Sequence, residues 1–130
     1  RIPIDRDLVV CDKIDFDVAR NATLRLLEGE NPPDAILAFN DIITYAAFDA
    51  IKSKGLRIPE DVAIIGFTDG DTAAFVTPRL SAIMDQAHVQ GTKACQLLMK
   101  SINGDEKIYK EVVPMILKIR ESSEKNLVKK

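Results

Sequence analysis

Polar side chains follow two short apolar segments, and their types and spacing could do chemistry. Asn40-Asp41 comes directly after residues 35–39, and Thr68-Asp69 comes directly after residues 62–67. Their amide, hydroxyl and carboxylate groups could bind a polar ligand. The nearby carboxylates could also serve in acid–base catalysis or hold a divalent cation. These carboxylates are Asp41, Asp69, Asp71 and Asp85.

Simpler structural roles explain most of these carboxylates. Asp41 is placed to cap a helix, and Asp-Gly-Asp at residues 69–71 is typical of a turn. No glycine-rich nucleotide-binding loop follows a strand, and no nucleophile stands beside a base. We therefore predict a binding site with no catalytic residue, no metal and no cofactor.

The single histidine and the two cysteines also argue against catalysis or a metal site. His88 has no second histidine or nearby cysteine with which to form a zinc site or a Ser-His-Asp triad. We interpret it as a polar residue in the first turn of a helix. Cys11 and Cys95 lie far apart without metal-like spacing, and we expect free, mostly buried thiols in a reducing compartment such as the cytoplasm.

A β-α-β unit would position the polar residues. Residues 35–39 and 62–67 are uninterrupted runs rich in Ile, Val and Ala, which is typical of strands buried in a parallel sheet, and an amphipathic helix separates them. Because open α/β sheets bind ligands at the carboxyl edge of their strands, we expect the site at this edge.

Strand and helix patterns alternate along the whole chain and predict one α/β domain with a doubly wound, mostly parallel sheet. Asp15 or Asp17 should cap the first helix, and Gly55 should end the second. Pro114 places part of the last strand at an edge or a bulge. The predicted strands are residues 8–11, 35–39, 62–67, 80–84 and 112–120, and the predicted helices are residues 18–28, 41–53, 72–75 and 87–102.

The helix over residues 41–53 has apolar groups on more than one face. One stripe should cover the sheet, whereas Tyr45 and Phe48 project from roughly the opposite side and suggest a partner surface. A neighbouring segment of the same domain could equally cover them. Phe75 and Val76 could join the same patch.

The helix over residues 87–102 carries a narrow face of small and apolar groups, which permits close approach to another element. Gly91 within this helix costs about 1 kcal/mol relative to alanine, so a packing reason is expected. The face consists of Gly91, Ala94, Cys95, Leu98 and Ile102.

Composition limits the classes of partner. A net charge of −2 and a pI near 5.4 argue against direct binding to nucleic acid, which needs a concentrated basic surface. No apolar run approaches the roughly 18 residues of a membrane span, and no signal-peptide pattern is present. The chain begins with Arg1 rather than methionine, so a targeting segment could be missing.

Four motifs together resemble the carboxyl-terminal half of LacI/GalR-type bacterial transcription regulators. They occur in the family's order and span nearly the whole chain. Related periplasmic sugar-binding proteins share the first two, so a periplasmic receptor fragment is the alternative, whereas the last two are more typical of regulators. The motifs are residues 35–41 (AILAFND), 55–67 (GLRIPEDVAIIGF), 77–83 (TPRLSAI) and 119–123 (IRESS).

The resemblance implies that residues 1–130 are part of an effector-binding and dimerisation domain. The fold would be a three-layer α/β half of the periplasmic binding protein type I kind. The DNA-reading domain would be absent, so operator DNA would be a partner only through it. Residues 85–106 would form a crossover helix that packs in the other subdomain of the intact protein, or on a second copy of this chain here. The implied function is ligand-controlled transcription, with a sugar or sugar derivative as effector and a cytoplasmic homodimer as the assembly.

The resemblance also implies the ligand positions. Asn40 matches the family's effector-binding asparagine, whose amide can both donate to and accept from a hydroxyl. The position after Gly-Phe is Thr68 followed by Asp69, where the family commonly has aspartate. Asp85 stands at the crossover, where the family has glutamine or a similar group. Ile14 stands where the family has a stacking aromatic residue, and Phe16 lies two residues further on. The resemblance places a dimer interface at Phe75 and Val76, with Tyr45 and Phe48 beside them.

Overall fold

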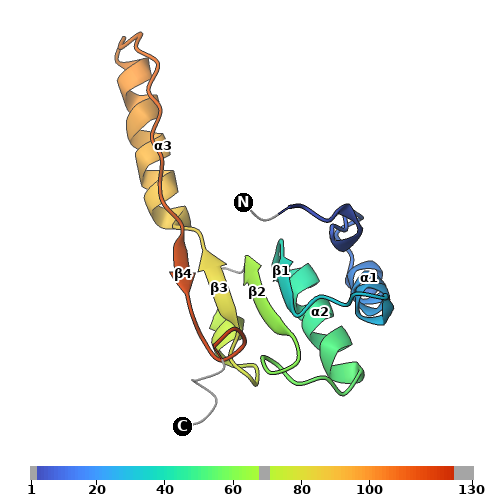
Figure 1. Cartoon of the computed structure of the whole chain (residues 1–130). Coiled ribbons are helices and arrows are strands. Elements are labelled where there is room, and N and C mark those ends of the chain that lie inside the picture. The colour runs from blue at the N-terminus through green and yellow to red at the C-terminus, as the bar shows by residue number, and fades with distance from the viewer. Residues whose placement is uncertain (1–2, 68–70, 125–130) are drawn as a thin grey trace.

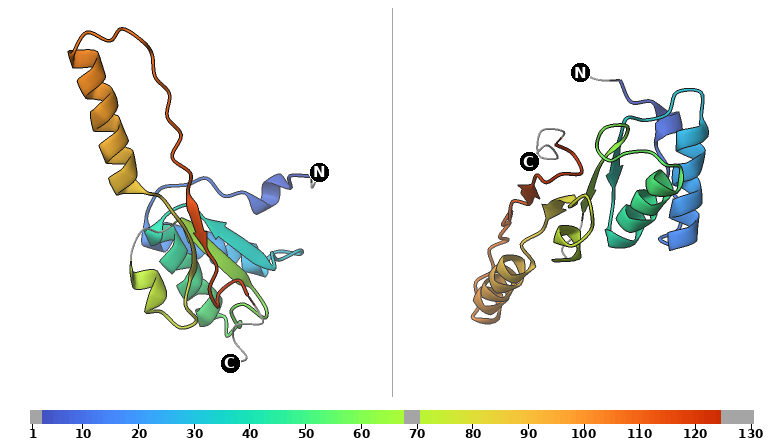
Figure 2. Two further views of the ribbon diagram at one scale, coloured as in Figure 1. Left: turned by 90° about the vertical axis from the view of Figure 1, so that its left-hand side faces the viewer. Right: turned by 90° about the horizontal axis from the view of Figure 1, so that it is seen from below.

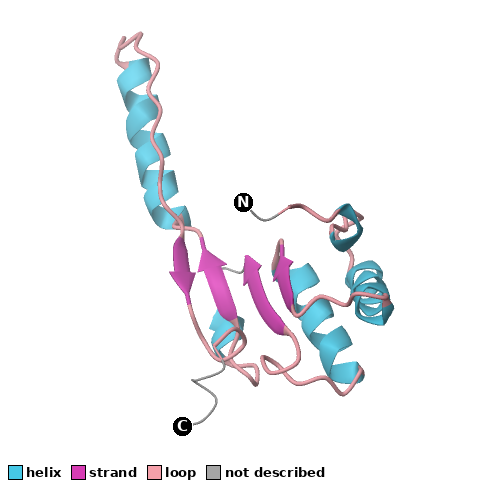
Figure 3. Ribbon diagram, in the orientation of Figure 1, coloured by secondary structure: helices cyan, strands magenta, loops and turns pink. Residues whose placement is uncertain are grey.

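The computed structural model describes residues 3–67 and 71–124 of the 130-residue chain. It consists of a four-stranded sheet with two helices beside it and a third helix that projects away (Figure 1). Figure 3 shows the alternation of helices and strands. The elements are η1 (Arg6–Leu8), α1 (Phe16–Glu28), β1 (Ala35–Ala38), α2 (Asp41–Ser53), β2 (Ala63–Phe67), η2 (Asp71–Ala74), β3 (Ser81–Met84), α3 (Ala87–Ile102) and β4 (Ile116–Lys118).

The sheet has the order β1-β2-β3-β4. β1, β2 and β3 are parallel, and β4 pairs with β3 in the antiparallel sense. In the register, Ala38 lies beside Gly66, and Gly66 lies beside Ala82. The mixed α/β class and the mostly parallel sheet are therefore confirmed. β4 is an edge strand that begins after Pro114, as expected of a residue that cannot donate to a ladder.

Helix boundaries follow from capping chemistry. Asp15 caps α1 by accepting a hydrogen bond from the Val18 amide. Asn40, not Asp41 as predicted, caps α2, and Asp41 is the first helical residue. Gly55, at φ 71°, supplies the left-handed residue just after α2.

Helices α1 and α2 pack side by side in the parallel sense. Arg20 pairs with Asp49 at 2.6 Å, and Glu28 pairs with Lys54 further along both helices. Because the partners ascend together along the two helices, both amino termini lie at the same end of the layer. The same packing accounts for Ala19 and Ala22 being buried on α1.

Only one face of the sheet is well covered within the described residues. Residues of β2 alternate between buried and half-buried, with Ile64 and Gly66 buried. On β1 the same alternation leaves Leu37 67% exposed. Since helices α1 and α2 lie together, the described part of the chain contains one helical layer (Figure 2). The third layer implied by the resemblance is therefore not found among these residues.

The core lies between α2, β2 and the segment that precedes β3. Its members include Phe48, Ile51, Ile64 and Leu80. The prediction that Phe48 projects outward is wrong, because its side chain is only 8% exposed. Tyr45 is half-buried against the same core, so the expectation of an outward face at this position is also wrong. Helix α2 is covered on more sides than a helix lying on a single surface.

The Ser122 hydroxyl joins β2 and β3 where these strands begin. It accepts a hydrogen bond from the Ser81 amide at 2.8 Å and donates to the Ile64 carbonyl at 2.6 Å. The Ser122 backbone continues the junction, because its carbonyl accepts from the Ile64 amide and its amide donates to the Arg79 carbonyl. Ser122 is fully buried. The Arg-Glu-Ser-Ser run therefore has a structural role.

Arg79 and Glu121 form an ion pair on the solvent-facing side of the same junction. The Arg79 backbone amide donates to Glu121 at 2.9 Å, and its guanidinium lies 2.9 Å from the same carboxylate. The amide and then the guanidinium lower the pKa of Glu121. A depressed folded-state pKa stabilises the fold above the unfolded-state pKa, and this contribution is lost as the pH falls through the folded-state value.

Helix α3 projects from the sheet, and residues 105–115 return beside it (Figures 1 and 2). Lys93 pairs with Glu111 at 2.8 Å, and the Tyr109 hydroxyl donates to Asp105 at 2.6 Å. No residue of α3 is buried, and a Cβ atom at Gly91 would have no atom of another element within 4 Å. The close approach expected for the Gly91 face is therefore absent within the described residues. Cys95 on this helix is exposed, so its predicted burial is wrong.

The segment before α1 differs from the predicted strand over residues 8–11. Asp5 caps a 3-10 turn over Arg6–Leu8, and residues 9–14 form no regular structure. Apolar residues favour a strand here, but β1 is the last strand of the sheet on this side and does not pair with them. Cys11 is a free, exposed thiol, which corrects the expected burial.

Substituting Ser122 by alanine should lower the free energy of unfolding by about 1–3 kcal/mol, because the Ser81 amide and the Ile64 carbonyl would lose a buried partner. Urea denaturation would measure this loss. Ser101→Ala, at an exposed position of α3, is the control and should stay within about 0.5 kcal/mol of the parent chain. Equal effects of the two substitutions would contradict the role of Ser122.

Candidate functional site

The carboxyl ends of β1, β2 and β3 form one edge of the sheet, where ligands bind in open α/β folds. Asn40 follows β1, and Asp85 follows β3 at the same edge. Asn40 is half-buried and Asp85 is exposed. Thr68 and Asp69, which follow β2 in the sequence, lie outside the described residues. The predicted edge thus contains the two polar residues that the structure can place.

Hydrogen bonds hold Asn40 on both its side chain and its backbone. Its side-chain oxygen accepts from the Ile43 amide at 2.9 Å. Its carbonyl accepts from the Thr44 amide at 2.8 Å and from the Thr44 hydroxyl at 2.6 Å. The sequence prediction assigned donor and acceptor roles to this amide, and one acceptor position is occupied by the helix cap.

Gly66 gives α2 room to approach the sheet at this point. A Cβ atom at Gly66 would lie 2.2 Å from the Thr44 hydroxyl oxygen and 2.5 Å from its methyl carbon. Thr44 is fully buried. The glycine of the Gly-Phe motif is therefore needed so that Thr44 can lie against β2 and hold the Asn40 carbonyl.

Ile14 and Phe16 lie at the start of α1, at the end of the helical layer where α2 also begins. Both are exposed, with fractions of 56% and 42%. Phe39 and Phe67 form an aromatic pair at the carboxyl ends of β1 and β2, with ring centroids 6.5 Å apart. Apolar and aromatic groups therefore stand beside the polar residues of this edge.

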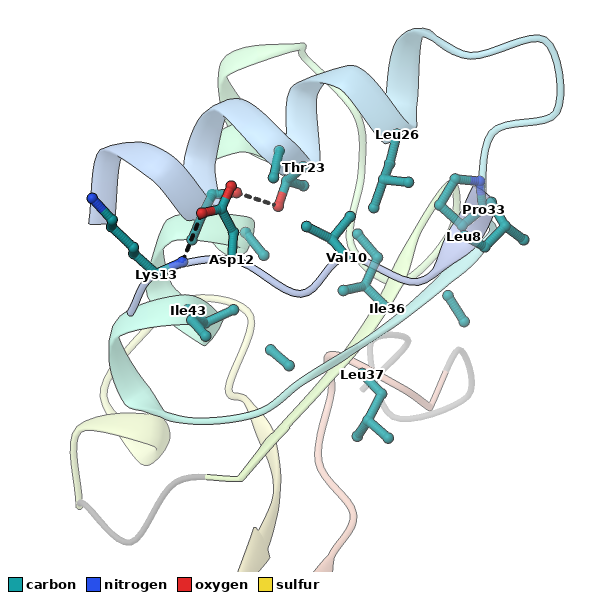
Figure 4. Close-up of a pocket in the computed structure, with 15 residues that line it drawn as sticks. Leu8, Val10, Asp12, Lys13, Thr23, Leu26, Pro33, Ile36, Leu37 and Ile43 are labelled. Atoms are coloured by element: carbon teal, nitrogen blue, oxygen red, sulfur yellow. Dashed lines mark hydrogen bonds between the residues drawn. The ribbon is translucent and has the colours of Figure 1, made fainter. Parts of the chain in front are cut away.

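A cavity of about 270 Å³, lined by apolar side chains together with Asp12, Lys13 and Thr23, lies between the amino-terminal segment, α1 and β1 (Figure 4). Leu8 and Val10 from the amino-terminal segment, Leu26 from α1 and Ile36 from β1 point into it. Asn40, Asp85, Ile14 and Phe16 are not among its lining residues. The cavity marks where residues 9–14 lie over β1 without pairing with it.

Titratable groups offer no catalytic arrangement in the part of the chain that the structure describes. No three histidine, cysteine or carboxylate side chains in that part gather closely enough to hold a metal ion. On the α3 arm, the Tyr109 hydroxyl lowers the pKa of Asp105, and Lys93 lowers the pKa of Glu111. The Lys93–Glu111 contact joins the return segment to α3, whereas the Tyr109–Asp105 contact lies within the return segment.

The sequence analysis did not predict a role at this edge for three residues that the structure places near it. Thr44 and Gly66 shape the turn around Asn40, and Gln86 donates to the Pro114 carbonyl at 2.8 Å where the chain crosses between the sheet and α3. The position of Gly66 within the Gly-Phe motif was an available signal. No signal in the sequence pointed to Thr44, because a threonine in a helix does not indicate what its hydroxyl contacts.

The fold is a mixed α/β arrangement with a mostly parallel sheet and a polar residue at its carboxyl edge. Residues 4–123 match the family described as periplasmic binding protein-like domain. The chain is 35% identical over 105 residues to the probable HTH-type transcriptional repressor ExuR of Bacillus subtilis, covering 81% of this chain and 32% of that protein.

Solved structures give the same result. A regulatory protein of the LacI family from Chloroflexus aggregans has a TM-score of 0.85 and 32% identity, covering 95% of this chain and 45% of that one. A LacI family regulator from Arthrobacter sp. FB24, in complex with lactose, has a TM-score of 0.74 and 29% identity, covering 85% and 42%.

This chain belongs to the family of periplasmic binding protein-like domains, and it matches the part of LacI-type transcription regulators that contains such a domain. The relatives are repressors and regulators, not enzymes. The chain spans about a third of the length of the curated relatives it matches. No helix in the described part of the chain has the length and apolar character needed to cross a membrane.

Gly66→Ala should destabilise the chain by about 1–3 kcal/mol, because the added methyl group would overlap Thr44. The double variant Gly66→Ala with Thr44→Ala should lose less than the sum of the two single changes, since the overlapping hydroxyl and methyl group are removed. Urea denaturation would measure all three variants.

Gly91→Ala is the matched control, because open space surrounds that position. It should stabilise the chain by up to about 1 kcal/mol through helix propensity. If the changes in unfolding free energy at positions 44 and 66 are strictly additive, the side chains at these two positions do not overlap as proposed.

Proposed function

We propose that this chain is the effector-binding and dimerising part of a LacI-type repressor whose DNA affinity a small carbohydrate controls. The observation that carries the proposal is the edge formed by three parallel strands, at which Asn40 is held on a helix cap. Family membership supports it, and the lactose complex of a relative supports a sugar as the ligand class.

The proposed contacts are those at the carboxyl edge. Asn40 and Asp85 would bind hydroxyl groups, with Thr68 and Asp69 contributing from the adjacent strand end. Ile14 and Phe16 would pack against the apolar side of the ligand. Thr68, Asp85 and Ile14 differ from the residues that the family commonly uses at these positions, so we propose a sugar derivative as readily as a simple hexose.

The proposed mechanism is thermodynamic linkage. Residues 1–130 would supply one wall of a cleft, and the helix-turn-helix of a full-length regulator would read operator DNA. A ligand that prefers one arrangement of the two walls changes DNA affinity only by its differential affinity for the two states. We propose that this takes place in the cytoplasm, where the regulator would meet DNA.

The structure leaves fewer of the predicted residues available for the proposed dimer interface. Phe48 belongs to the core and Tyr45 packs against it, so neither provides the free aromatic face that was predicted. Phe75 remains, with 81% of its surface exposed, and Val76 is half-buried beside it. We therefore propose that Phe75 is the main apolar contact of a homodimer.

A full-length regulator should change its DNA affinity when it binds its effector. The test combines a DNA site selected in vitro with fluorescence anisotropy, in the presence of lactose, other neutral sugars and sugar acids. A typical coupling of about 1–3 kcal/mol corresponds to a shift of about 5- to 150-fold.

The 130-residue chain is the control in that titration, because its acidic balance and its lack of a basic recognition helix predict no selective DNA binding. Tight selective binding by the chain alone would contradict the proposed division of roles. Failure of every sugar and sugar acid to bind the full-length protein would contradict the proposed effector class.

Phe75→Glu should dissociate the dimer expected at micromolar concentration, because it would bury an unpaired charge at the contact. Sedimentation velocity of the 130-residue chain measures this change. Ile108→Glu is the control, since Ile108 is fully exposed and lies on the return segment beside α3, away from η2 (Figure 1). A parent chain that sediments as a monomer, or a Phe75→Glu variant that stays dimeric, would remove this interface.

A further inference from the structure

We infer that Asn40 presents its side-chain N–H groups to the effector, and that Thr44 and Gly66 form the positioning pair that holds it in this orientation. The inference deepens the proposed function and depends on Asn40 being an effector contact. It assigns a chemical requirement to the ligand: an acceptor oxygen at this point.

The orientation of the Asn40 amide follows from the helix cap. Its side-chain oxygen is aimed at the first turn of α2, where it accepts from the Ile43 amide at 2.9 Å. The amide nitrogen is attached to the same planar carbon and is therefore directed away from that turn. Within the described residues it donates to no protein acceptor, although Asn40 is half-buried. The side chain thus offers its N–H groups to a bound molecule.

The backbone of Asn40 is fixed by Thr44. Both the amide and the hydroxyl of Thr44 donate to the Asn40 carbonyl, at 2.8 Å and 2.6 Å. Asn40 itself has an extended backbone, with φ −152° and ψ 179°, and the helix begins at the next residue. The second donor therefore restrains the residue at which the chain changes from strand to helix.

Gly66 makes this restraint possible. The Thr44 hydroxyl occupies the space that a side chain at position 66 would need, since a Cβ atom there would lie 2.2 Å from the hydroxyl oxygen. Thr44 has no exposed surface, so its hydroxyl cannot turn toward water. The absence of a side chain at position 66, near the end of β2, therefore helps to fix the position of Asn40, which lies between β1 and α2.

The preferred ligand group follows from the donor. An amide N–H binds carboxylate, carbonyl, ring or hydroxyl oxygen, and it binds ionised oxygen most strongly. A sugar acid satisfies this requirement with a carboxylate, and a neutral sugar satisfies it with a hydroxyl or ring oxygen.

Asn40→Asp separates the two roles of the side chain. Aspartate caps a helix as well as asparagine does, so the thermal midpoint of the full-length regulator should be unchanged or higher. Aspartate has no donor when ionised, so affinity for the probe should fall at least tenfold. Isothermal titration calorimetry with the neutral probe lactose measures this effect, and unchanged affinity would overturn the donor assignment. With glucuronate, repulsion between two carboxylates adds to the loss, so only unchanged affinity is decisive there.

Thr44 is tested in the ligand-free full-length protein by amide hydrogen exchange. Thr44→Val keeps the shape and removes the hydroxyl, and it should speed exchange of the Ile43 amide at least tenfold. Thr44→Ser keeps the hydroxyl and should leave this rate close to that of the parent protein. The Ile64 amide, which donates within the sheet junction, is the internal reference for general destabilisation.

The outcomes separate this inference from the proposed function. If the Ile43 and Ile64 amides accelerate by the same factor in Thr44→Val, Thr44 is only a structural residue and the positioning role is wrong. If the parent protein binds neither lactose nor glucuronate, the proposed sugar site fails and the donor assignment fails with it, while hydrogen exchange still decides the role of Thr44. If the parent binds and Asn40→Asp binds equally well, the proposed function stands and the donor assignment fails.

Discussion

The close approach of Thr44 to Gly66 is the constraint on which the arrangement of the candidate site depends. Helix α2 can lie against β2 only because position 66 has no side chain, and the hydroxyl that fills the space holds the Asn40 carbonyl. This contact restrains the backbone of Asn40, whose side chain caps the helix and is oriented by that cap. The missing side chain at Gly66 on β2 thereby affects the position of Asn40, which follows β1.

The opposite end of the sheet is held by a different kind of contact. The Ser122 hydroxyl bridges the Ser81 amide and the Ile64 carbonyl, and Arg79 with Glu121 closes the junction from outside. Buried polar groups stabilise a fold when each has a partner, and they are costly when one partner is removed. The register between β2 and β3, and so the alignment of their carboxyl ends at the site, depends on this satisfied network.

Two apolar surfaces remain without cover among the described residues. One is the sheet face with Leu37 and Leu117, and the other is α3, where Leu98 and Ile102 are exposed. The curated relatives are about three times as long as the matched region.

Local sequence alone determined the α/β class and most element boundaries of this chain. The predicted helix over residues 87–102 coincides with α3, and the predicted strands over 35–39, 62–67 and 80–84 overlap β1, β2 and β3, because apolar period, caps and Gly55 are local signals. It also placed Asn40 at the carboxyl edge, since that position follows from strand direction. Only the tertiary structure decided that Phe48 is buried, that residues 8–11 do not form a strand and that Thr44 meets Gly66. These outcomes depend on which segments pack together. A periodic pattern within one segment does not indicate which other segments will contact it.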